Sequence, residues 1–298
     1  MPLATTGELV TRAAAARSAV AAFNVITLEH VEAVVAGAES EDSPVVLQVS
    51  ENAVKFRYGR LLPLARAAVA AAERAAVPVA LHLDHVQSDD LLRQAAGAGF
   101  SSVMYDASRL PYAENLAATR AAAHWAHTQG LWIEAELGRV GGKTGPDGRV
   151  DPGAAPLDAH APGARTDPVE ARAFVAESGV DALAVAIGSS HAMTTRTAAL
   201  DHTLLERLAG ALDVPLVLHG SSGLPDDELT AAAAGGIAKV NVGTALNIAM
   251  TGAIRAFLAA HPEAVDSRSY LTVGREAMVR TVAEIIRTLG RHEAPAAR

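Results

Sequence analysis

Three histidines of this chain stand just past the ends of apolar stretches. His85, His191 and His219 each follow a run of Val, Leu, Ile and Ala residues that is typical of a buried parallel strand. Three neutral imidazoles with an open fourth position form a catalytic zinc arrangement. A single histidine of this kind is more often a satisfied polar residue, but three at equivalent strand ends favour a shared metal ion. We therefore predict that they converge at one end of a closed parallel sheet.

Acidic residues occupy the same positions at strand ends. Asp84 directly precedes His85, and one of the two must be turned by the end of the strand because successive strand residues point to opposite faces. Asp84 could act as a general acid and base, or it could orient an imidazole. Asp106 and Glu134 lie at the ends of two further strands and could hold an alternative position of the metal, or they could form ion pairs around the mouth of the barrel. For Glu136 we favour an ion pair at the mouth of the sheet.

Two Gly- and Ser-containing segments resemble anion sites. Residues 220–223 follow the seventh predicted strand, residues 241–244 include the end of the eighth, and both segments lead into helices. Backbone N–H groups at helix N-termini are the usual phosphate seat of a barrel. Each segment alone would more often be a simple helix cap. Together, next to His219, they favour a phosphorylated substrate.

The elements that must position these groups follow from the alternation of apolar and Ala-rich helical stretches. This alternation implies right-handed β–α–β units and a parallel sheet. Eight repeats in roughly 250 residues fit a TIM (β/α)8 barrel, which would make residues 1–298 a single α/β domain. A doubly wound open sheet is the alternative, but no Gly-x-Gly-x-x-Gly follows the first strand. The predicted strands are 18–23, 45–50, 77–84, 101–105, 131–136, 181–187, 214–219 and 237–242. The predicted helices between and after them are 28–40, 60–76, 88–98, 112–129, 168–178, 201–211, 225–234 and 244–260.

Three further segments complete the predicted domain. A short helix over 5–17 begins at Thr5 or Thr6, with Glu8 placed for a capping box. An extra C-terminal helix over 274–290 closes or decorates the barrel. The connection 138–167 is rich in Gly, Pro and Asp and is too long for a simple turn, so we interpret it as a mobile active-site loop. A surface insertion is the other interpretation of this loop.

Composition excludes several classes of protein. The net charge is −8 with both signs interspersed, and no basic stripe or basic amphipathic helix predicts binding to nucleic acid or to a membrane surface. The chain has no cysteine, so disulfides and thiolate chemistry are excluded and His and carboxylates remain as metal ligands. No apolar run predicts a signal peptide or a membrane span, so the expected location is cytoplasmic.

These motifs resemble those of the class II (zinc-dependent) ketose-bisphosphate aldolases, the family of fructose- and tagatose-bisphosphate aldolases. The resemblance extends from about residue 5 to residue 290. It depends on the combination of six segments, none of which would be specific alone. The segments are Ala-Phe-Asn at 22–24, Leu-His-Leu-Asp-His at 81–85, Glu-Ala-Glu-Leu-Gly at 134–138, Ala-Val-Ala-Ile-Gly-Ser-Ser-His at 184–191, Leu-His-Gly-Ser-Ser-Gly at 218–223 and Lys-Val-Asn-Val-Gly-Thr at 239–244.

The resemblance implies a role for each matching residue. His85, His191 and His219 would bind Zn²⁺, with Asp106 and Glu134 beside an alternative metal position, and Asp84 would move the proton of the aldehyde-derived hydroxyl. A monovalent cation near the phosphate site and a homodimer or homotetramer are further expectations. Substrate and phosphate binding is expected of Asn24, Ser50, Gly220, Ser222, Asn241, Thr244, Arg196 and Arg268. Arg268 lies in a segment whose Arg often acts across a subunit boundary.

The sequence departs from the family pattern in three places. Lys143-Thr144 follows the Gly-Gly of the long loop where a Glu is usual, which leaves Asp147 or Asp151 as substitutes. Ala192 replaces a Gly, and Arg196 replaces a phosphate-binding Lys. Three hypotheses follow: an aldolase that cleaves or forms a ketose phosphate with dihydroxyacetone phosphate, a related aldolase with a different aldehyde partner, and a non-catalytic descendant that binds a sugar phosphate or a metal.

Overall fold

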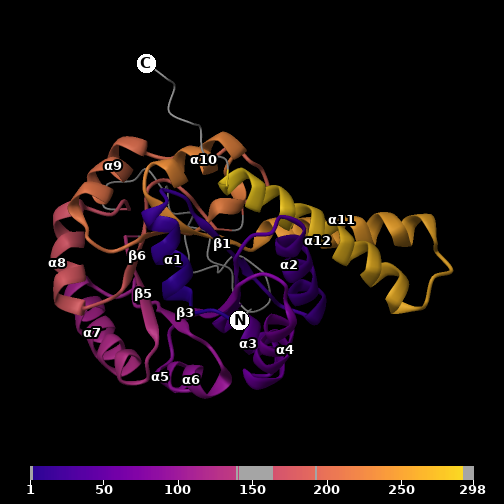
Figure 1. Ribbon diagram of the computed structural model, residues 1–298, viewed down its shortest axis with the longest axis horizontal. Helices are drawn as coiled ribbons and strands as arrows, with labels where there is room; N and C mark the ends of the chain where they lie inside the picture. The colour runs from indigo at the N-terminus through magenta and orange to yellow at the C-terminus, as the bar shows by residue number, and fades with distance from the viewer. Residues whose placement is uncertain (1–2, 139, 141–163, 192, 291–298) are drawn as a thin grey trace.

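Eight parallel strands close into one barrel, in which each strand pairs with the next and β8 pairs back with β1 (Figure 1). This closed sheet confirms the predicted TIM barrel. The computed structural model describes residues 3–138, 140, 164–191 and 193–290. Its strands are β1 (Val20–Asn24), β2 (Val45–Ser50), β3 (Val79–Val86), β4 (Ser102–Tyr105), β5 (Trp132–Leu137), β6 (Ala182–Val185), β7 (Leu216–Leu218) and β8 (Ile237–Val242).

A ring of helices covers the outside of the barrel. Outward side chains of the strands, such as Phe23, Leu47 and Leu183, pack with the helices in one large apolar core. Burial of this kind is worth about 25 cal/mol per Å² and is the main source of stability. The helices that follow the strands are α2 (Leu28–Ser40), α3 (Glu51–Phe56), α4 (Leu62–Arg74), α5 (Asp89–Leu92), α6 (Ala95–Ala98), α7 (Tyr112–Thr128), α8 (Pro168–Ser178), α9 (His202–Ala211), η1 (Ser221–Gly223), α10 (Asp226–Ala234), α11 (Thr244–Ala260) and α12 (Ser267–Leu289).

Helix α1 (Thr6–Ala15) closes the end of the barrel where the strands begin. Thr5 caps it, and a reciprocal bond with Glu8 confirms the predicted capping box. Leu9 and Val10 pack against a small apolar cluster formed by residues near the starts of β1, β2, β3 and β8. Because apolar side chains fill this end, the polar side chains inside the barrel lie toward the carboxyl ends of the strands.

Two register shifts interrupt the ladders of the barrel. One lies between β3 and β4, at Leu83/Val86, and the other lies between β7 and β8, at Leu216/Val217. At the first, His85 has φ 52°, a left-handed conformation that costs a non-glycine residue about 1–2 kcal/mol. The shift breaks the strict alternation of strand residues, so Asp84 and His85 can both face the barrel interior.

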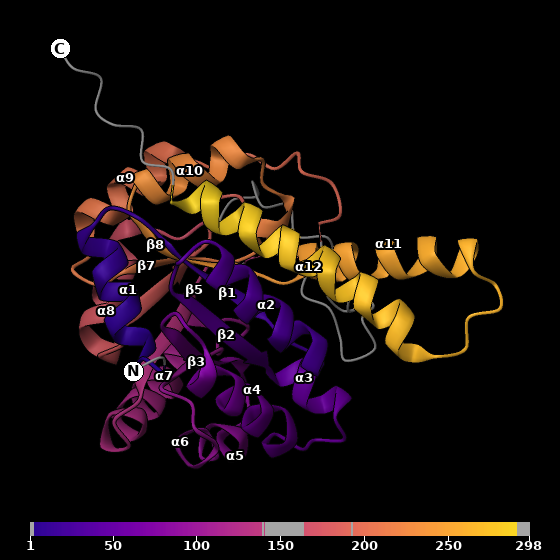
Figure 2. The ribbon, with the colours of Figure 1, turned by 45° about the vertical axis from the view of Figure 1, so that its right-hand side comes forward.

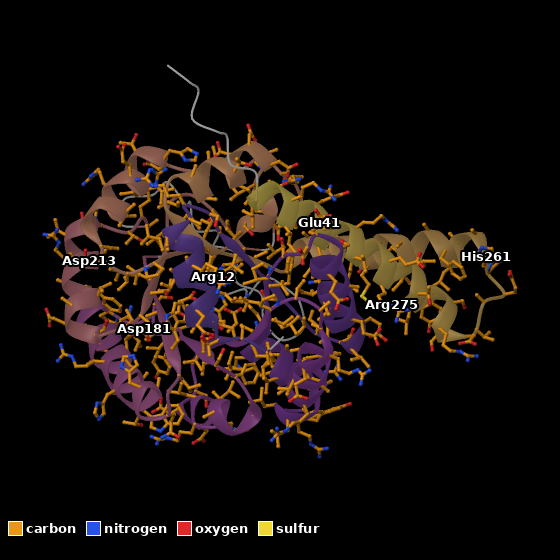
Figure 3. All side chains as sticks on the ribbon, in the orientation of Figure 1. Arg12, Glu41, Asp181, Asp213, His261 and Arg275 are labelled. Carbon is orange, nitrogen blue, oxygen red and sulfur yellow. The ribbon has the colours of Figure 1, made fainter. Side chains whose placement is uncertain are left out.

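Helices α11 and α12 form a hairpin that projects away from the barrel, which we call the arm (Figures 1 and 2). The second half of α12 returns along α2, where a Cβ on Gly37 would lie 2.6 Å from Val282 Cγ1. Two surface ion pairs join the same helices. Arg275 contacts Glu32, and Arg287 contacts Glu41 at 2.6 Å; Arg275 and Glu41 are labelled in Figure 3.

All eight predicted strands are present, and no bound differs from the prediction by more than two residues. The predicted helix 88–98 is instead two short helices, α5 and α6, and the predicted helix 274–290 begins earlier, at Ser267. Helix α3 was not predicted, because its six residues are too few for a helical period to be recognised.

Among the described residues, none of the helices has the length and apolar character needed to cross a membrane. The predicted loop 138–167, with Asp147 and Asp151, lies largely outside the described residues.

Candidate functional site

The end of β3 brings a histidine together with a carboxylate from the end of β4. His85 Nδ1 lies 2.9 Å from Asp106 Oδ2, and a carboxylate can only accept, so the ring donates from Nδ1. The other carboxylate oxygen of Asp106 accepts from the backbone N–H and the hydroxyl of Ser108. Asp106 therefore fixes the orientation of the His85 ring, and Nε2 is the nitrogen left to bind a cation.

His219, at the end of β7, is completely buried between two carboxylates of β5. Its Nε2 donates to Glu134 Oε1 at 2.8 Å, and its Nδ1 lies 3.4 Å from Glu136 Oε2. Burial alone would lower the pKa of His219, but the hydrogen bonds to Glu134 and Glu136 outweigh it and raise the pKa to about 9. The two carboxylates thus favour positive charge at this position, which a bound cation would supply in place of the proton on Nδ1.

Four side chains from four separate strands or strand ends meet above these contacts. Each of His85, Glu136, His191 and His219 offers a ligand atom, and these atoms all lie within 4.8 Å of one another. The imidazole rings are edge to face, with centroids 4.9 Å apart for His85 and His219, 5.2 Å for His85 and His191, and 5.8 Å for His191 and His219. Ligands about 2 Å from a shared Zn²⁺ need this kind of proximity. The donor set fits a metal ion with N and O ligands.

The two glutamates of β5 have different places. Glu136 belongs to the group of four, whereas the sequence suggested an ion pair at the mouth for it. From the sequence, Glu134 was expected beside an alternative metal position. In the structure it lies two residues before Glu136 on β5, deeper in the barrel, and contacts His219 and Lys239. Alternation along the strand carries the relevant signal, since residues two apart point to the same face at different depths.

Asp84 is buried at the end of a chain of amide hydrogen bonds. Gln48 Nε2 donates to Asn24 Oδ1 at 3.2 Å, and Asn24 Nδ2 donates to Asp84 Oδ2 at 2.8 Å. Burial raises the pKa of Asp84, but the charges of His85, His219 and other neighbours overcome this and lower it to about 2. The free oxygen, Oδ1, is buried with no hydrogen-bond partner among the described residues. A ligand group would satisfy it.

The predicted anion segments lie side by side across β7 and β8. Ser221 Oγ donates to the Asn241 carbonyl at 2.5 Å, and Ser222 Oγ accepts from Ala245 N at 3.2 Å in the first turn of α11. Gly220 has φ 68°, and a Cβ there would lie 2.6 Å from the Ser190 carbonyl carbon, so only glycine fits without a shift. Both amide atoms of Asn241 are buried without a hydrogen-bond partner in the described part of the chain.

The remaining predicted binding residues are spread more widely. Ser50 pairs in register with Asp84 and caps α3 through its hydroxyl, which places it next to the site. Thr244 is the first residue of α11, directly after Gly243. Arg196 donates to the Leu224 carbonyl and pairs with Asp226, and Arg268 pairs with Asp266 at the start of α12, on the arm. Neither Arg is joined to the histidine group by a contact in the described structure.

Two residues of the site were missed from the sequence. Gln48 is the only polar side chain inside the otherwise apolar run 45–49 of β2, and Lys239 is the only charged residue of β8. Both are completely buried. A polar side chain inside an apolar strand is costly unless it is paired, and this is the signal that could have identified them.

Comparison with known proteins agrees with the fold and identifies the family. The family described as class-II fructose-bisphosphate aldolase matches residues 4–294. The YdjI aldolase from Escherichia coli K12 superposes with a TM-score of 0.80 at 30% identity, over 97% of each chain. A putative fructose-1,6-biphosphate aldolase from Coccidioides immitis superposes with a TM-score of 0.83 at 30% identity, over 95% of each chain. Fructose-bisphosphate aldolase from Campylobacter jejuni shares the fold, with a TM-score of 0.78 at 23% identity over 96% of this chain and 95% of its own. The chain therefore belongs to the class-II fructose-bisphosphate aldolase family.

Proposed function

We propose that this protein is a zinc-dependent aldolase that cleaves or forms a ketose phosphate, with dihydroxyacetone phosphate as the nucleophile partner. The observation that carries the proposal is the group of His85, Glu136, His191 and His219 beside Asp84, whose Oδ1 is buried without a partner among the described residues. The anion segments of β7 and β8 adjoin this group and would hold the phosphate. When bound, the metal would supply Lewis-acid stabilisation of the negative charge that develops on the ketone-derived oxygens.

The protein's own residues would bind the substrate and move its proton. Asp84 is held as a carboxylate, so it can accept the proton of the aldehyde-derived hydroxyl during cleavage and return it during condensation. Asn24 fixes the orientation of this carboxylate through its hydrogen bond to Oδ2. The backbone at Gly220, with the buried amide of Asn241, would orient the phosphate end of the substrate.

A related aldolase with a different aldehyde partner is the second candidate. Arg196 supports it, because its guanidinium is held by Asp226 and the Leu224 carbonyl rather than directed to the histidine group. A non-catalytic, metal- or phosphate-binding protein is the third candidate, and the activity assay below separates it from the first two.

The metal site is tested by titration with zinc. We expect the wild-type protein to bind about one Zn²⁺, and we expect His191→Ala to weaken binding by about 100-fold, because a ligand is lost. His202→Ala is the matched control, since His202 on α9 pairs with Glu228 of α10 and has no contact with the group of four in the described structure. Isothermal titration calorimetry gives both values, and equal affinity of His191→Ala and the control would contradict the site.

The reaction is tested with a panel of ketose mono- and bisphosphates. We expect release of dihydroxyacetone phosphate from at least one of them, loss of this activity with EDTA, and its return with added zinc, because the charge on the ketone oxygens is otherwise unstabilised. Activity that survives EDTA and is trapped by borohydride would indicate an imine mechanism instead. No release from any substrate, with metal bound, would favour the non-catalytic candidate.

Asp84 is tested by an isosteric change. We expect Asp84→Asn to lower kcat by roughly 10²- to 10⁴-fold, the usual contribution of a general acid and base, while zinc still binds. Asp90→Asn, an exposed residue of the short helix after the same strand, is the control and should retain full activity. Undiminished turnover in Asp84→Asn would remove the proposed proton transfer.

We also propose that the arm pairs with a second copy of the chain. Helix α11 buries only Leu246, whereas Ile248, Leu258 and, in the turn of the arm, Val265 are 46%, 38% and 93% exposed. Apolar side chains on a projecting hairpin are typical of a subunit interface. Arg268 at the start of α12 would then lie near the partner subunit. His261, labelled in Figure 3, marks the outer end of α11.

We expect multi-angle light scattering to find a dimer or tetramer for the wild type and a smaller species for Ile248→Asp/Leu258→Asp. Val169→Asp is the control, because Val169 is equally apolar and 77% exposed but lies on α8. A monomeric wild type at micromolar concentration would contradict the proposed pairing.

A further inference from the structure

A buried chain of hydrogen-bonded ionisable side chains runs beneath the histidine group, from β8 through β5 to the end of β7. Lys239 Nζ donates to Glu134 Oε2 at 2.9 Å, and Glu134 Oε1 accepts from His219 Nε2 at 2.8 Å. All three side chains are completely buried. In the described structure Lys239 makes no hydrogen bond or ion pair with any member of the group of four, and the side chain that connects it to the group by hydrogen bonds is Glu134.

The register shift between β7 and β8 places Lys239 inside the barrel. Leu216 pairs with Ile237, but Val217 pairs with Lys239, so Ala238 is an extra residue on β8. Ala238 packs in the apolar floor of the barrel, and Lys239 reaches Glu134 in the layer above. Neighbouring residues of one strand thus both point inward, as at Asp84 and His85 on β3.

Such an arrangement is costly if it serves only to fill space. A buried ion pair contributes little net stability, and well-packed apolar side chains of the same volume are often equal or better. His82, the nearest other ionisable group, is 3.9 Å from Glu134 Oε2 and stays neutral, because burial lowers its pKa to about 3. Lys239 is therefore the charged donor that holds Glu134 in place.

We propose that Lys239 is a positioning residue of the metal site: it holds Glu134 as the acceptor for His219 Nε2–H and thereby fixes the imidazole with Nδ1 turned toward Glu136 and the other ligands. The inference depends on the metal site proposed above. A neutral imidazole carries one N–H, so the nitrogen that donates to Glu134 cannot be the nitrogen that binds the cation. Rotation of the ring would exchange the two.

His85 shows the same principle with different donors. Its orienting carboxylate, Asp106, is held by the backbone N–H and hydroxyl of Ser108, which lie near the surface. In the described part of the chain no loop residue other than His219, at the end of β7, donates to Glu134, and its neighbours on β4 and β6 belong to strands whose backbone groups pair within the sheet. A long, flexible side chain from β8 spans this distance, and lysine supplies the donor at its tip.

The proposal is tested by zinc affinity, measured by competition with a chromophoric chelator. We expect Lys239→Met to bind zinc about 10- to 100-fold more weakly than the wild type, the usual effect of losing support behind a ligand. Phe174→Leu, which disturbs buried packing on α8 outside the barrel, controls for lost stability and should keep wild-type affinity. Circular dichroism and the melting temperature report on folding of each variant.

A second pair of variants isolates the hydrogen bond. Glu134→Gln/Lys239→Met keeps a neutral acceptor for His219, whereas Glu134→Leu/Lys239→Met removes it. We expect the Gln variant to bind zinc at least about 10-fold more tightly than the Leu variant, and this comparison also serves if Lys239→Met alone does not fold.

Two results would overturn the inference. One is a folded Lys239→Met protein with wild-type zinc affinity, and the other is equal affinity of the Gln and Leu double variants. A wild-type protein that binds no zinc would overturn the proposed metal site itself, and this result is distinguished from the other two because it does not depend on any variant.

Discussion

The pairing of β8 with β1 is the contact on which the site depends. Ala22 lies beside Asn241 and Phe23 beside Val242, so the last strand of the sheet is hydrogen-bonded to the first. Only a closed sheet turns its inner face into an enclosed space where side chains from all eight strands can meet. Helix α1 fills the end of this space where the strands begin, which leaves polar groups to gather at the other end.

Charged side chains inside the barrel are paired with partners from other strands rather than with neighbours on their own strand. Glu134, on β5, accepts hydrogen bonds from His219 at the end of β7 and from Lys239 of β8. Burial alone would raise the pKa of Glu134, but the charge of Lys239 and the hydrogen bond from His219 outweigh burial, so the pKa falls well below its usual range. Asp84 is held as a carboxylate by its histidine neighbours in the same way. The interior therefore holds charged groups in fixed orientations, and little reorganisation is needed when a charged ligand enters.

Irregularities within the strands, rather than loops, set the orientation of several of these interior side chains. At β3 a left-handed His85 lets Asp84 and His85 share the interior, and at β8 an extra residue does the same for Ala238 and Lys239. A regular strand would direct one of each pair into the helical shell. Position 220 is also constrained by the backbone, because the chain passes too close to Ser190 there for any residue but glycine to fit.

Local sequence patterns were enough to identify the barrel and the family. Apolar runs separated by amphipathic stretches are local patterns, and they predicted all eight strands because each run must be buried wherever it lies. The histidines at or just past the carboxyl ends of β3, β6 and β7 could be grouped because parallel strands place these ends together. Three features of the site could be seen only in the folded chain. Glu136, and not Glu134, joins the histidines, and Lys239 supports Glu134. Arg268 lies on the arm. These choices depend on register shifts, on depth within the barrel and on the direction of a projecting hairpin, and each of these is set by packing between segments that are far apart in the chain.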